Sequence, residues 1–211
     1  MLSLLFTTLS LLTLSTTALP FSNQAPPTAE QWTIPSLSMH MMTRYTGLPG
    51  SQPWPESTQF PSTIAFDVNM PNNHTAHCRA EWANGTLPDV GDSMGCTGEG
   101  PGRVRFRMRE YTELGHRRPE LGFVLSVWRD DRQPNQHTIL MGETPVTAND
   151  PSEPSSYLTC LLGAPFDGLR CSIAGLMSVR RALVLEARVE EGGDGDVDTE
   201  KSALVTTSLE R

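Results

Sequence analysis

Hydrophobic and polar residues alternate along several short segments of this chain, and a period of two is typical of half-buried β-strands. In segment 64–70 every second residue is Ile, Phe, Val or Met, with Ala, Asp and Asn between them. The other alternating segments are 32–41, 103–109, 121–127, 139–141 and 183–189. Stretches rich in Pro, Gly and Ser separate them. The pattern predicts an all-β fold, either a single antiparallel β-barrel or a sandwich.

Two of these segments depart from a simple strand pattern. Pro35 lies inside segment 32–41, so we expect the opening strand to break near that residue. In segment 183–189 the alternation favours a strand. The longer run 179–191 is also compatible with a helix, and both structures remain open for it.

The four cysteines form two pairs that are each close in sequence. An even number of cysteines in an exported chain is typical of a disulfide framework, because disulfides persist in oxidising compartments. Three connectivities are open to four cysteines. We expect the local one, Cys78–Cys96 and Cys160–Cys171, so that two local disulfides staple the fold.

The second cysteine pair fits a hairpin between segments 157–162 and 169–173. A register that places Cys160 opposite Cys171 brings two apolar pairs onto the same face, as a buried face requires. These pairs are Leu162 with Leu169 and Leu158 with Ile173.

The first cysteine pair is less regular. Cys78 lies in a stretch, 76–82, that alternates like a strand, whereas Cys96 lies in the Gly-rich segment 89–102. Glycine weakens strands. We therefore expect the disulfide Cys78–Cys96 to tie a loop to the edge of a strand.

The two ends of the chain differ in composition from the middle. Residues 1–18 are uncharged, rich in Leu and end in small residues, which predicts a signal peptide cleaved after Ala18. We expect a flexible segment at 19–30, a single β-barrel domain at 31–189 and a disordered acidic tail at 190–211. Alternating aspartates in the tail resemble a calcium loop, but Thr199 and Val205 stand where that loop needs Gly and Glu.

Charge and modification motifs agree with export to the extracellular space. The formal net charge is −8, so we expect neither nucleic acid nor membrane as a partner. Asn73 and Asn84 each begin a glycosylation sequon, Asn-His-Thr and Asn-Gly-Thr. We expect a soluble, secreted glycoprotein.

Four arginines, Arg103, Arg105, Arg107 and Arg109, fall on one face of a single predicted strand. Arginine makes bidentate contacts with carboxylate, sulfate and phosphate groups, so this ladder is a hypothetical docking stripe for an acidic glycan or protein surface. The alternative is a solvated outer face paired with acids on neighbouring strands, such as Glu110, Glu120 or Asp67. Trp54, between two prolines, is the tryptophan most suited to stack on a sugar.

The sequence offers no convincing catalytic or metal site. Gly91-Asp-Ser93-Met is similar to the nucleophile block of one class of lipases and esterases, but none of the five histidines has an Asp three residues before it. His40 lies among methionines that alternate between two faces, and His74 and His77 lack a third ligand. We expect no catalytic residue, no cofactor and no metal.

Several motifs together resemble one known family. They are Trp32-Thr-Ile34, the strand Thr63–Val68 followed by Pro71, Cys78 with Trp82, Cys96 before Val104-Arg-Phe106, Phe123–Val127, and the Cys160…Cys171 hairpin. In these features the chain is similar to the Alternaria major-allergen-like family of small fungal secreted proteins. The Gly-rich segment 89–102 and the acidic tail are departures from that family.

The resemblance implies a compact β-barrel with two local disulfides and no established enzymatic activity. It also implies an effector- or allergen-like role. The resulting hypothesis is a secreted fungal non-catalytic binding protein that acts on an extracellular host or cell-wall partner, either a protein or a glycan. The alternative function is a carbohydrate-binding module for cell-wall glycans.

Overall fold

The structure is a computed structural model that describes residues 29–190 except 45, 47, 51–52, 84–86, 89–90, 92, 101, 114–120 and 134–135. The predicted signal peptide 1–18, the sequon residue Asn84 and the tail from 191 onward lie outside the described residues. Most of the predicted flexible segment lies outside as well. Its last two residues, Ala29 and Glu30, begin the first strand, so regular structure starts two residues before the predicted domain start at 31.

Strands make up almost all of the regular structure among the described residues, which confirms the all-β prediction. They are β1 Ala29–Ile34, β2 Leu37–Met41, β3 Ser62–Met70, β4 His74–Trp82, β5 Met94–Glu99, β6 Arg103–Glu110, β7 Gly122–Gln133, β8 Gln136–Ala148, β9 Ser156–Leu162, β10 Leu169–Ile173 and β11 Leu183–Val189. Two single-turn 3₁₀ helices, η1 Glu56–Thr58 and η2 Pro71–Asn73, lie between strands. No helix among these residues is long and apolar enough to cross a membrane.

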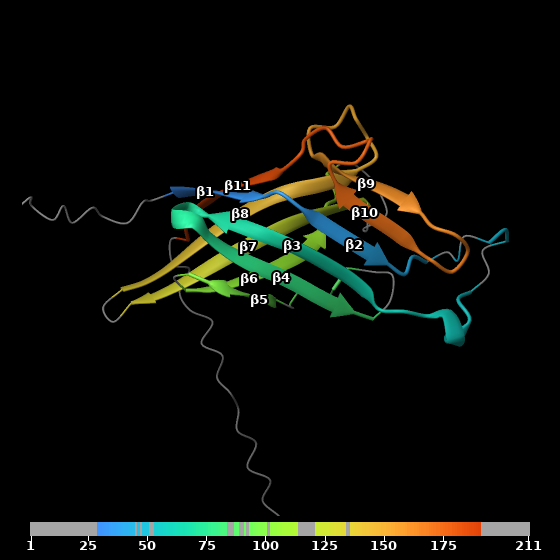
Figure 1. Ribbon diagram of the computed structural model, residues 1–211, viewed down its shortest axis with the longest axis horizontal. Coiled ribbons are helices and arrows are strands. Elements are labelled where there is room, and N and C mark those ends of the chain that lie inside the picture. Colours follow the sequence, from blue (N-terminus) through green and yellow to red (C-terminus); the bar gives the residue numbers. More distant parts are fainter. Residues whose placement is uncertain are drawn as a thin grey trace, which may run out of the picture.

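Nine of the described strands close into a barrel in the order β8-β7-β6-β5-β4-β3-β2-β10-β9, and β9 pairs with β8 again (Figure 1). The closing pair is parallel, at Thr147 and Ala148, whereas the other pairs are antiparallel. The predicted antiparallel barrel is therefore a mixed one. The turn-rich stretch after β8 folds back so tightly that β9 starts beside the end of β8 and runs in the same direction.

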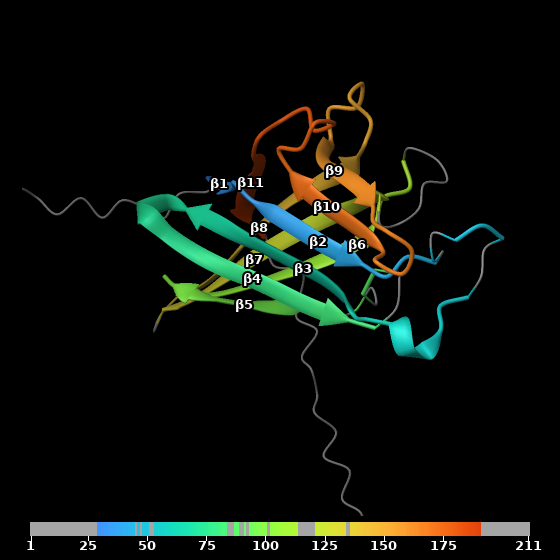
Figure 2. The same cartoon turned by 45° about the vertical axis from the view of Figure 1, so that its right-hand side comes forward.

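The break at Pro35 lets the opening strand change partners. Before the proline β1 pairs with β11, and after it β2 pairs with β10 (Figure 2). The pairing of β1 with β11 also settles the late segment as a strand. Trp32 lies opposite Leu185, and both side chains are completely buried.

The barrel core is built from the inward residues of the alternating segments. Trp32, Phe106 and Phe123 are its largest fully buried side chains. Val189, at the end of β11, is exposed although it was predicted on the inward face. The predicted inward face is also wrong for β8, where Leu140 is buried and Ile139 and Met141 are half-buried. β8 is long, and its unbroken ladder with β7 places these two residues on the outer face.

Both predicted disulfides are present. The hairpin register is confirmed for Cys160 and Cys171 and for the apolar pairs beside them. Leu162 is nevertheless 53% exposed, because it lies at the end of β9 where the hairpin extends past the barrel (Figure 1). The expectation for the other disulfide was wrong, since Cys96 belongs to a regular strand, β5, and lies directly opposite Cys78.

Candidate anion-binding groove

The barrel wall separates between β5 and β6. The ladder between these strands covers only two residue pairs, Met94 with Phe106 and Gly95 with Arg105. From Cys96 onward β5 pairs with β4 instead. The disulfide Cys78–Cys96 lies where this change of partner occurs, so it ties β5 to β4 just as β5 leaves β6.

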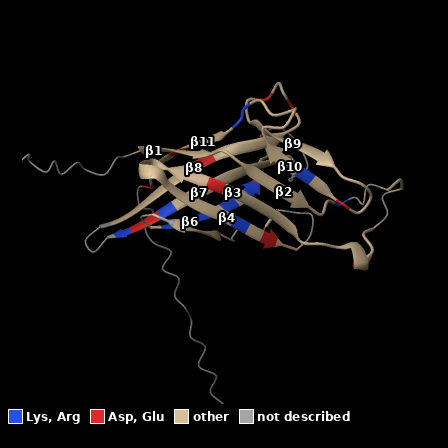
Figure 3. Ribbon diagram, in the orientation of Figure 1, with Lys and Arg blue, Asp and Glu red and all other residues tan. Residues whose placement is uncertain are grey.

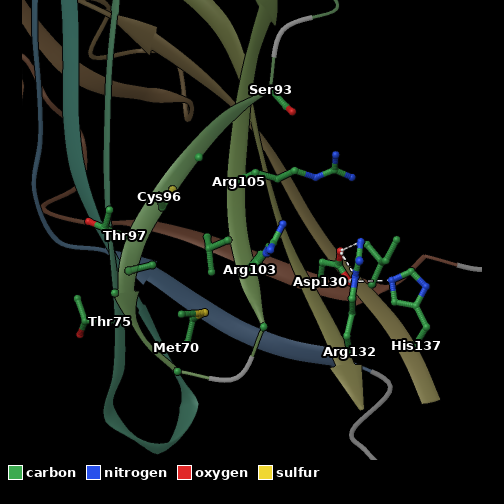
Figure 4. A pocket seen from close by; sticks show the side chains of 17 residues that line it. Met70, Thr75, Ser93, Cys96, Thr97, Arg103, Arg105, Asp130, Arg132 and His137 are labelled. Atoms are coloured by element: carbon green, nitrogen blue, oxygen red, sulfur yellow. Dashed lines mark hydrogen bonds and ion pairs between the residues drawn. The ribbon is translucent and has the colours of Figure 1, made fainter. Parts of the chain in front are cut away.

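A groove of about 850 Å³ lies over this separation (Figure 4). Its apolar part comes from buried side chains of three strands, Met70, Ala76 and Val104. Its polar rim carries charged side chains from β6, β7 and β8, namely Arg103, Arg105, Asp130, Arg132 and His137. The volume is in the range of ordinary ligand sites.

Glycines allow the backbone to approach closely around the groove. At Gly98 a Cβ would collide with the backbone oxygen of Thr75 on β4 and would lie 2.9 Å from the Ala76 Cα. At Gly102, whose φ is +79°, a Cβ would collide with Asp131 and with the backbone of Asp130. The Gly-rich composition therefore permits β5 and the turn after it to pack against β4 and β7.

One acidic residue in the rim is already neutralised by its neighbours. Asp130 accepts hydrogen bonds from Arg132 at 3.1 Å and from His137 at 2.7 Å. Partial burial favours a higher pKa for the Asp130 carboxyl, but the bonds from Arg132 and His137 outweigh it and hold that pKa below its ordinary value. Asp130 is therefore a carboxylate whose charge is balanced within its own cluster.

The other two rim arginines, Arg103 and Arg105, are exposed to solvent. Arg103 lies opposite Asp130 in the ladder, yet no carboxylate among the described residues lies within ion-pair distance of Arg103 or Arg105. The guanidinium of Arg105 stands over the ring of Trp128, 5.4 Å from its centre. This cation–π contact orients Arg105 without neutralising it.

The predicted arginine ladder is one row on the outer face of β6, but only half of it lies at the groove. Arg109 forms an ion pair with Glu143 of β8, and Arg107 stands 5.2 Å over Trp128. Glu143 also accepts a hydrogen bond from Ser126. The predicted solvated and paired face thus holds for Arg109, although Glu143 is the partner. Only Arg103 and Arg105 line the groove.

Partial burial favours a higher pKa for the Glu143 carboxyl, but the hydrogen bonds from Ser126 and Arg109 outweigh it and hold that pKa below its ordinary value. Glu143 is therefore ionised and satisfied, and it anchors the half of the ladder that lies outside the groove.

Trp54 lies outside the groove and is not an exposed platform. Its ring packs edge-on against Phe60 and Phe166, with centroids 5.6 Å and 6.0 Å away, and its Nε1 donates to the backbone oxygen of Thr43. The structure does not bring Trp54 together with the arginines. The groove lining contains no Phe, Tyr or Trp among the described residues.

The sequence reasoning missed three rim residues, Asp130, Arg132 and His137. They lie near the tip of the β7–β8 hairpin, where two acidic residues stand between two basic ones at the end of β7 (Figure 3). The Pro-Asn pair at 134–135 of the sequence was a usable signal for a hairpin. The β6–β7 ladder places Asp130 opposite Arg103, and this pairing could not be predicted from the sequence of one strand alone.

The other residues considered for chemistry are spread over the barrel. Ser93 and His137 lie at opposite ends of the groove (Figure 4). His77 binds Asp67 at 2.7 Å, and His40 stacks on Phe60 and contacts the Asp167 backbone oxygen. No group of three potential metal ligands occurs among the residues described. Asn73 is exposed in the turn between β3 and β4.

Comparison with known proteins gives no relative for this chain: no family model, no curated protein and no solved structure matches it.

Proposed function

We propose that this chain is a secreted, non-catalytic binding protein whose groove takes anionic groups of an extracellular partner. The observation that carries the proposal is the pair Arg103 and Arg105, which projects over the groove without a carboxylate partner among the described residues. Guanidinium groups pair with carboxylate or sulfate in a bidentate geometry. The partner is therefore a polymer that carries such groups along its length.

The shape of the groove favours an extended partner. The groove runs across β5, β6, β7 and β8 and is open to solvent, so a chain can lie along it while its acidic groups meet the arginines (Figure 4). A neutral sugar module would need exposed aromatic faces for stacking. Because Trp54 packs against two phenylalanines elsewhere, the anionic partner is the better match.

Export and family belong to the same proposal. Two disulfides indicate an oxidising environment, which supports secretion. The mixed barrel and its two local disulfides support the resemblance to the Alternaria major-allergen-like family. An effector- or allergen-like role rests on that resemblance alone.

The test is a binding titration of the purified chain against polyuronate oligosaccharides, sulfated glycans and acidic peptides at two ionic strengths. We expect one class to bind, more weakly in high salt, since exposed charges are screened over about 8–10 Å. The double variant Arg103→Ser/Arg105→Ser should lose about tenfold in affinity or more. The control Arg170→Ser, on β10, removes a paired surface arginine and should bind like the parent. A parent that binds no class, or a double variant that binds equally well, contradicts the proposal.

A further inference from the structure

The chain leaves the barrel at the edge of the groove. The end of β11 pairs with β8, so that Val189 lies opposite Leu140. The next residue, Glu190, donates its backbone N–H to the oxygen of Ile139 at 2.8 Å. Ile139 is itself part of the groove lining. Glu190, the last described residue, therefore lies beside the groove.

The sequence that follows is complementary to the rim in charge. Residues 191–200 read EGGDGDVDTE, which contains five acids and no basic residue. The groove rim presents Arg103, Arg105 and Arg132 around one neutralised acid. A local excess of positive charge thus stands next to the most acidic stretch of an acidic protein.

The distance to the arginines is short for this segment. The step from β11 across β8 and β7 to β6 is three strand spacings, roughly 14 Å. An extended chain covers about 3.3 Å per residue, so about five residues after Glu190 span it. Asp194 and Asp196 are the acids at that reach.

The spacing of the acids also matches the spacing of the arginines. Asp194, Asp196 and Asp198 occupy alternate positions, and an extended chain carries alternate side chains on one face. Arg103 and Arg105 occupy alternate positions of β6. Both rows therefore repeat at about 6.6 Å. The aspartate pattern does not fit a calcium loop, but it fits this pair.

We propose that the acidic segment 191–200 occupies the groove of its own chain and competes there with the external anionic partner. Because the segment is tethered beside the groove, its effective concentration is of the order of millimolar, so weak carboxylate–guanidinium contacts suffice to occupy the site. The competition rests on the proposed function. The contact between tail and arginines does not.

The first test measures the contact itself in the full chain. The variant Asp194→Asn/Asp196→Asn/Asp198→Asn and the parent are treated with an arginine-selective dicarbonyl reagent, and modification is followed site by site by mass spectrometry. We expect Arg103 and Arg105 to react about threefold faster or more in the variant, and Arg170 to react equally in both. A control variant, Glu56→Gln/Glu81→Gln, removes exposed acids outside the groove lining and should behave like the parent.

The second test separates the contact from the proposed function. The same proteins are titrated with the polyuronate oligosaccharide used above, and the aspartate variant should bind it about threefold tighter or more than the parent. Faster arginine modification without any polyuronate binding would keep the tail contact and overturn polyuronate as the partner. Unchanged modification, with or without polyuronate binding, would overturn the tail contact.

Discussion

Arg129 and Glu30 form a bidentate ion pair inside one end of the barrel, with Nη1 and Nη2 of the arginine at 2.7 Å and 2.8 Å from the two carboxylate oxygens. Their side chains are only 7% and 9% exposed. Asp131 accepts from the same guanidinium, and Trp32 lies beneath it and donates to Glu30. The pair fastens the first strand to the hairpin that carries the groove rim.

Breaking this pair should destabilise the barrel strongly. Glu30→Gln leaves the buried guanidinium of Arg129 with one carboxylate, and removing one partner of a buried pair costs about 3–5 kcal/mol. Asp131 remains, so the lower end of that range is expected. Denaturant unfolding with the disulfides intact measures it. Glu186→Gln, at an exposed pair with Arg188, is the control and should change stability by less than about 0.5 kcal/mol. Equal losses would contradict the role of the buried pair.

The same pair should make stability depend on pH on the acid side. Burial favours a higher pKa for Glu30, but the hydrogen bonds from Arg129 and Trp32 outweigh it and place its pKa below the ordinary 4.5. A carboxyl with a depressed folded-state pKa contributes its full stability above the unfolded-state value and loses it as pH falls through the folded-state value. Unfolding free energy should therefore decline below about pH 4.5, and it should decline less steeply in Glu30→Gln. If unfolding free energy depended on pH equally in the parent and in Glu30→Gln, the acid-side decline would not come from Glu30.

Much of the fold could be predicted because the core is encoded locally. The alternation in β3 and β6 identified the inward residues, and the apolar pairs beside Cys160 identified the register of its hairpin. The parallel closure of β8 with β9 could not be predicted, because it depends on a tight connection and only two residue pairs.

The groove was predictable only in part. All four arginines of the ladder were predicted as docking residues from one strand alone. The ion pair of Arg109 with Glu143, and the limit of the groove lining to Arg103 and Arg105, depend on neighbouring strands. The Gly-rich run around Cys96 suggested a loop, since glycine is unfavourable in strands. In the structure this run forms strand β5, and the glycine at position 98 lets β5 lie close to the backbone of β4.

The two disulfides should differ in their effect on anion binding by the groove. Removing Cys78–Cys96 by a double serine variant should cost about 3 kcal/mol of stability and weaken anion binding, because this disulfide fixes β5 to β4 at the point where the two-residue ladder of β5 with β6 ends. Removing Cys160–Cys171 should cost a similar amount, since both loops are short, but should leave binding intact. Unfolding curves and the polyuronate titration measure the two effects. Binding that is lost in both variants, or in neither, would show that the first disulfide does not position the groove.

Gly102 should be the least replaceable residue of the turn that borders the groove. Its φ of +79° is unfavourable for residues with a side chain, and a Cβ there would press on the Asp131 carboxylate that holds Arg129. Gly102→Ala should therefore destabilise the barrel by about 1–3 kcal/mol. Gly95→Ala is the matched control in the same Gly-rich run, since a Cβ at Gly95 meets no atom within 4 Å. Denaturant unfolding of the two variants compares them directly, and a Gly95 variant as unstable as the Gly102 variant would place the cause in general loss of glycine instead of in the contact with Asp131.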